Sequence, residues 1–122
     1  MTDLFQLRPL IWMGSTQRDF RAMPAAVKSD MGYALYVAQR GGKHRNAKPL
    51  KGFGGAGVVE IVTDHRGDTF RCIYTIRLAD AVYVIHVFQK KSKTGRETPK
   101  TDKALIVQRL REAEQLAKGK QA

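Results

Sequence analysis

The sequence predicts an α+β fold in which a small antiparallel sheet follows two helices and precedes a third. Three β-rich runs between residues 58 and 89 are joined by short turns, which is typical of antiparallel hairpins. Two other segments, one ending before Gly41 and one over 101–117, carry apolar residues at helical spacing. We therefore expect a single domain over 1–122, with about four strands and all helices on one side of the sheet.

The first strand is expected over Leu4–Trp12, where apolar residues alternate loosely. Pro9 has no N–H to donate, so this strand belongs at a sheet edge or at a bulge. Ser15 is then placed as the N-cap of a short helix, which Pro24 interrupts. Pro24 is expected as the first residue of the second helix, where its missing N–H costs nothing.

The second helix is the strongest local prediction, because its apolar residues fall on one face. Gly41 and Gly42 end it, and a loop extends to Gly57. The stripe consists of Val27, Met31, Ala34, Leu35 and Ala38.

The three later strands are expected over Val58–Asp64, Thr69–Arg77 and Ala81–Gln89. Strict alternation in the last strand places one set of residues on a common face. This face holds Val82, Val84, His86, Phe88 and Lys90. A final helix is expected over Thr101–Ala117, followed by a frayed tail over Lys118–Ala122.

Positive charge dominates the composition and is concentrated in two loops. The chain has 22 Lys and Arg against 11 Asp and Glu, a formal net charge of +11, which favours nucleic acid or ribosome as a partner. The alternative is a pair of solvated charged loops on a soluble basic domain. We expect phosphate contacts from Lys43, Arg45, Lys48, Lys51, Lys91, Lys93 and Arg96.

Several other classes are disfavoured by the sequence. The lone cysteine, Cys72, excludes an internal disulfide and fits a reducing cytoplasm, and no apolar run is long enough to span a membrane. The start of the sequence lacks a basic segment followed by an apolar core, so we expect no secretion signal. His44, His65 and His86 are scattered, so we expect no metal and no cofactor. The glycines near Gly52 do not fit a P-loop.

RNA supplies its own nucleophile, the 2′-hydroxyl, so basic and acidic side chains suffice to cleave it. Arg71, His86 and Lys90 have suitable chemistry on two adjacent strands. Each also has a structural alternative: Arg71 as a solvent-facing strand residue, His86 as a hydrogen-bonded core histidine, and Lys90 as a strand end in water.

A set of segments, in order and spacing, resembles the phage-derived branch of the RelE/HigB toxin superfamily. The resemblance extends from Trp12 to Ala117, and its most specific part is HxFxKKS followed by TP. The segments are Tyr36–Gly42, Lys48–Gly52, Val59–Ile61, Phe70–Tyr74, Val84–Ser92 and Thr98-Pro99.

The resemblance implies a RelE-like fold and a metal-independent, ribosome-dependent endoribonuclease that cleaves mRNA. It also implies neutralisation by a cognate antitoxin encoded beside it, expected to be a helix-turn-helix protein. Arg71 matches the family's transition-state arginine, and Lys90 falls where many members have a second catalytic cation.

Two departures leave the general base open. The basic pair that RelE carries falls near Glu60 and Val62, and no tyrosine follows Tyr83 to match the C-terminal catalytic one. Glu60 or His86 is then the candidate base, although Glu60 is equally a structural partner for Arg71. A non-catalytic nucleic-acid- or ribosome-binding protein on the same fold is the main alternative, and a metal-dependent phage endonuclease is a weaker one.

Overall fold

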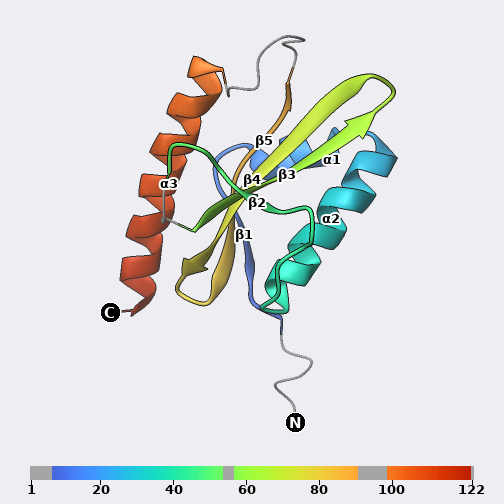
Figure 1. Cartoon of the computed structure of the whole chain (residues 1–122). Coiled ribbons are helices and arrows are strands. Elements are labelled where there is room, and N and C mark those ends of the chain that lie inside the picture. Colours follow the sequence, from blue (N-terminus) through green and yellow to red (C-terminus); the bar gives the residue numbers. More distant parts are fainter. Residues whose placement is uncertain (1–6, 54–56, 91–98, 122) are drawn as a thin grey trace.

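The computed structural model describes residues 7–53, 57–90 and 99–121. Its elements follow the predicted order of strand, two helices, three long strands and a helix (Figure 1). They are β1 (Leu10–Trp12), α1 (Thr16–Arg21), α2 (Ala25–Gln39), β2 (Lys48–Pro49), β3 (Val58–His65), β4 (Asp68–Leu78), β5 (Ala81–Lys90) and α3 (Lys100–Gln121).

The sheet has five strands in the order β1-β5-β4-β3-β2, one more than expected. The additional strand, β2, comes from the segment expected to be a loop and pairs with β3 only through Lys48 and Pro49. So short a strand leaves no periodicity to detect. As Pro9 predicted, β1 is an edge strand. It runs parallel to β5 and begins at Leu10, while residues 4–6 of the expected strand lie outside the described residues.

Helices cover both faces of the sheet, which corrects the expectation of one side. α2 packs on one face over Val59 and Tyr74, in what we call the α2-side core. α3 packs on the opposite face through Ile106 and Ala113, in the α3-side core. The reason lies in β4 and β5, whose side chains are buried on both faces, so each face needs an apolar cover. Figure 1 shows α2 and α3 flanking the sheet from opposite sides.

The helix ends differ from prediction in two places. All five residues of the α2 stripe are buried, as predicted. Pro24 is the N-cap of α2 and not its first residue, because its ψ of 150° is extended. α3 continues to Gln121, beyond the expected end of the helix at Ala117. Ala117 is still buried against the sheet, and the helix adds one more turn at little cost once it is anchored there.

A β-bulge in β5 decides which side chains reach the site. Ile73 of β4 pairs with His86, but the next residue, Tyr74, pairs with Val84. Ile85 is therefore an extra residue, and the alternation of side chains shifts there. The predicted common face is wrong beyond Val84, because the bulge turns His86 and the alternating residues after it toward the α3 side.

Candidate functional site

The four candidate catalytic residues come from three adjacent strands and lie on the α3 side of the sheet. Glu60 of β3 pairs with Ile73 of β4, which pairs with His86 of β5. Arg71 lies two residues before Ile73 on β4 and therefore on the same face. Lys90 on β5 is its diagonal neighbour, because Arg71 itself pairs with Phe88. Such diagonal neighbours are about 7–8 Å apart, within reach of long side chains. The bulge thus brings together residues that strict alternation would have placed on opposite faces.

Arg71 and Glu60 form an ion pair at the centre of this group. Arg71 Nη1 lies 3.3 Å from Glu60 Oε2, and the two side chains are 12% and 17% exposed. The Arg71 Nε is buried and has no hydrogen-bond partner among the residues that the structure describes. The guanidinium is thus held by one carboxylate but not saturated by it, and partial burial strengthens its interaction with an incoming anion.

Lys90 and Lys48 add positive charge around the ion pair. Lys90 is only 8% exposed, so it does not simply end its strand in water. Lys48 of β2 is paired directly with Glu60, which places it on the same face, and it is exposed. The carboxylate therefore lies between cations on two sides.

His86 occupies a buried hydrogen-bond network and matches the interpretation as a core histidine. Its Nε2 lies 2.7 Å from Asp102 Oδ1, and its Nδ1 lies 2.9 Å from Arg109 Nη1. A guanidinium only donates, so Nδ1 accepts and Nε2–H donates to the carboxylate. Burial lowers the pKa of His86, Arg109 lowers it further, and Asp102 opposes both. The neutral ring is held in one tautomer.

Arg109 extends this network to the start of the chain. It also donates to the Ile85 carbonyl at 3.3 Å and to Ser15 Oγ at 3.1 Å. Ser15 in turn donates to Asp19 Oδ2 at 2.7 Å, instead of capping the backbone of α1. The network joins α3, the bulge of β5 and the β1–α1 junction, and so fixes the strand that carries Lys90.

Sequence reasoning missed Asp102 and Arg109, although a signal for them exists. Both fall on the apolar stripe of α3, four residues before and three residues after Ile106. A charged residue on a buried stripe requires a partner, because an unpaired buried charge is costly.

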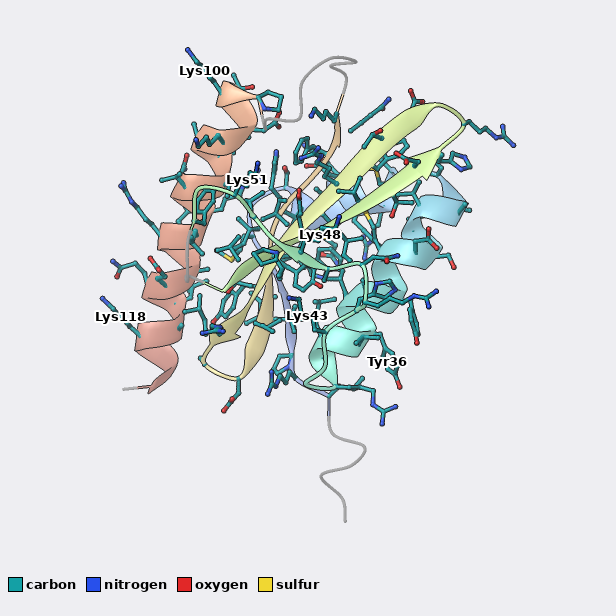
Figure 2. The ribbon with its side chains drawn as sticks, in the orientation of Figure 1. Tyr36, Lys43, Lys48, Lys51, Lys100 and Lys118 are labelled. Carbon is teal, nitrogen blue, oxygen red and sulfur yellow. The ribbon has the colours of Figure 1, made fainter. Side chains whose placement is uncertain are left out.

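The basic residues of the loop between α2 and β3 are exposed. Figure 2 shows Lys43, Lys48 and Lys51 along this segment, which crosses one side of the molecule from α2 toward α3. Arg45 lies in the same segment and is exposed. The other three expected phosphate contacts, Lys91, Lys93 and Arg96, lie outside the described residues.

Two kinds of feature are absent from the described ranges. They contain no group of three or more His, Cys, Asp or Glu residues arranged to hold a metal ion. They also contain no helix long and apolar enough to cross a membrane.

Comparison with known proteins identifies the family. A family model for phage-derived Gp49-like proteins (DUF891) matches residues 18–111. No curated protein and no solved structure matches the chain. The matched range covers well over half of the sequence and includes all four candidate catalytic residues. The chain therefore belongs to the phage-derived Gp49-like family.

Proposed function

We propose that this protein is the toxin of a type II toxin–antitoxin pair within the RelE/HigB superfamily. In this proposal it acts in the cytoplasm and cleaves mRNA on the ribosome without a metal. The observation that carries the proposal is the half-buried pair of Arg71 and Glu60, flanked by Lys90 and Lys48 on one face of the sheet. Membership of the phage-derived family and the net charge of +11 support it.

In the proposed reaction, the phosphoryl group is transferred from the 5′-oxygen of one nucleotide to the 2′-oxygen of the preceding one. The 2′-oxygen attacks the adjacent phosphorus while its proton passes to the Glu60 carboxylate. The bond from phosphorus to the 5′-oxygen breaks, and that oxygen takes a proton from Lys90, leaving a 2′,3′-cyclic phosphate. Arg71 stabilises the negative charge that grows on the phosphoryl oxygens. We assign the base to Glu60 because both ring nitrogens of His86 are engaged.

A cognate antitoxin, in this proposal a helix-turn-helix protein encoded next to the toxin, neutralises the activity. Induction of this chain alone is expected to arrest growth and translation, and co-expression with the neighbouring protein to restore both. Normal growth with soluble protein present would contradict the toxin assignment.

The sharpest test removes the arginine that acts at the transition state. Arg71→Ala and the charge-preserving Arg71→Lys are both expected to slow single-turnover cleavage of ribosome-bound mRNA about a hundred- to a thousandfold. Ribosome binding should change little, because the extra phosphoryl charge exists only at the transition state. Lysine retains the pairing with Glu60 but lacks the two-pronged donor. The matched control is Arg77→Ala, which removes an exposed cation from the same strand.

The outcomes separate an enzyme from a binder. Wild-type cleavage by folded Arg71→Lys would make the assignment of Arg71 wrong. Tight ribosome binding by the wild-type protein with no cleavage would instead identify a non-catalytic ribosome-binding protein. Circular dichroism of each variant establishes that it is folded.

A further inference from the structure

A cavity between α2 and β3 has chemistry that the proposed cleavage does not use. Its volume is about 220 Å³, and it lies where β3 continues beyond its pairing with β2 at Glu60 and Val59. Beyond Glu60, this edge of β3 has no strand partner among the residues that the structure describes. The lining residues are Asp30, Tyr33, His44, Arg45, Asn46, Ile61, Val62 and Thr63.

An exposed aromatic ring forms one wall of this cavity. Tyr33 of α2 is 60% exposed, so most of its ring is open to a ligand. The His44 ring meets it edge-on, with centroids 5.6 Å apart and planes at 85°. The Asn46 N–H donates to His44 Nδ1 at 3.1 Å, which holds the imidazole in place. The cavity therefore offers an ordered aromatic surface to a flat ligand.

The other lining groups match the parts of a nucleotide. Ile61 and Val62 provide apolar contact, and the exposed Arg45 provides a cation for a phosphate. Asp30 and Asn46 provide an acceptor and a donor suited to the edge of a base. The volume is below the roughly 300–1,000 Å³ of pockets for drug-sized ligands, so the cavity suits a single base.

The cavity lies across β3 from the candidate active site, because Ile61 in its lining belongs to the α2-side core. Val62 lines it and is also the directly paired neighbour of Arg71 on the next strand. An RNA strand with a phosphate at Arg71 would have to pass around the edge of β3 for one of its bases to enter the cavity.

We propose that this cavity binds one unpaired base of single-stranded RNA, with the base stacked on Tyr33 and a phosphate at Arg45. The proposal takes the kind of polymer from the proposed function but does not depend on cleavage. Stacking on an aromatic side chain is tolerant of base identity, whereas the polar groups at Asp30 and Asn46 would favour some bases over others.

The test measures affinity and not turnover. A short fluorescein-labelled single-stranded RNA is titrated with the full chain at fixed salt, and binding is followed by anisotropy. Tyr33→Ala is expected to weaken binding about fivefold to a hundredfold. Tyr33→Phe keeps the ring and should retain most of the affinity. The matched control is Tyr36→Ala, on the same helix and exposed, whose ring is covered by Arg40 at 5.9 Å and points away from the sheet (Figure 2).

A second titration with duplex RNA of the same length distinguishes stacking from general attraction. The Tyr33→Ala effect should disappear there, because paired bases are not available to stack. Unchanged affinity of Tyr33→Ala for single-stranded RNA would overturn the proposal, as would an equal loss in Tyr36→Ala. Loss of antitoxin binding with RNA affinity unchanged would assign the cavity to a protein partner and also overturn it.

The same variants separate this proposal from the proposed function. If the wild-type protein never cleaves mRNA but Tyr33→Ala weakens RNA binding, the base site stands and the nuclease assignment fails. If the protein cleaves and Tyr33→Ala binds like wild type, the nuclease assignment stands and the base site fails.

Discussion

At the scale of single residues, hydrogen bonding distinguishes Arg71 from His86. Within the described part of the chain, Arg71 Nε has no hydrogen-bond partner, so Glu60 does not use all the donors of this guanidinium. His86 has donors and acceptors matched at both ring nitrogens and is only 5% exposed. A histidine in such a position contributes to stability, and protonation of its ring is linked to the free energy of unfolding.

This placement of His86 predicts a dependence of stability on pH. Burial lowers the pKa of His86 in the folded state below its ordinary value of 6.5, so the unfolded chain takes up a proton first as the pH falls. The stabilisation from the neutral ring is thus fully present above pH 6.5 and is lost as the pH falls from there toward the folded-state pKa. We expect the free energy of unfolding to decrease between pH 7 and pH 5.

Urea unfolding at several pH values checks this expectation. His86→Gln should be less stable at pH 7.5 and should depend less on pH below 6.5, the ordinary histidine pKa. The control is His65→Gln at the β3–β4 turn, which should retain the wild-type dependence. An unchanged pH dependence in His86→Gln would mean that this ring does not control acid stability.

At the scale of elements, the docking of α3 on the sheet depends on one close approach. Gly14 follows β1 with φ of +53°, a left-handed conformation that side chains disfavour. A Cβ there would lie 2.6 Å from Arg109 Nε. Arg109 cannot move away freely, because it donates to His86, Ile85 and Ser15.

Gly14→Ala is therefore expected to lower the free energy of unfolding by at least about 1–2 kcal/mol, the cost of the backbone conformation alone. The matched control is Gly32→Ala in α2, where the nearest atom to a new Cβ is 3.9 Å away. That change should raise stability by about 0.5–1 kcal/mol, because alanine is the better helix former. Urea unfolding of the two variants measures both effects. Equal stability of Gly14→Ala and the wild-type protein would mean that the close approach of Arg109 does not require glycine at position 14.

At the scale of the whole molecule, a segment with exposed basic residues runs between the two helices that cover the sheet. α3 and α2 flank opposite faces of the sheet, and the segment from Lys43 to Lys51 crosses between them (Figure 2). This segment passes both Lys48, beside Glu60, and Arg45, at the cavity. Four of the basic residues expected to contact phosphate, Lys43, Arg45, Lys48 and Lys51, are exposed along this segment.

Affinity for single-stranded RNA is expected to fall steeply with salt. With about six phosphate contacts, binding should weaken roughly a hundred- to a thousandfold between 50 and 200 mM salt. Lys51→Gln should reduce the slope of log affinity against log salt by about 0.7, the value for one contact to a single strand. Lys118→Gln, on the exposed surface near the end of α3, is the control and should leave the slope unchanged. A salt-independent affinity would show that the loop does not contact phosphate.

The fold was predictable from sequence wherever the signal is local. The α2 stripe, the hairpins of β3 to β5 and the edge position of β1 follow from periodicity, turn residues and Pro9. The stripe and the hairpins depend on the spacing of residues that are close in sequence. The edge position of β1 follows from the backbone N–H that Pro9 lacks. The residue types at Arg71, Glu60, His86 and Lys90 were likewise identifiable from the sequence, and their catalytic roles remain predictions.

Tertiary structure alone decided how these residues are combined. The bulge at Ile85 moves His86 and Lys90 to the face of Arg71, and β2 places Lys48 beside Glu60. Whether a bulge forms depends on which register of the two strands buries the most apolar surface on both faces of the sheet. The sequence of one strand alone does not show which register that is. The partners of His86 lie 16 and 23 residues further along the chain, so only the packing of α3 determines that its ring is held and neutral.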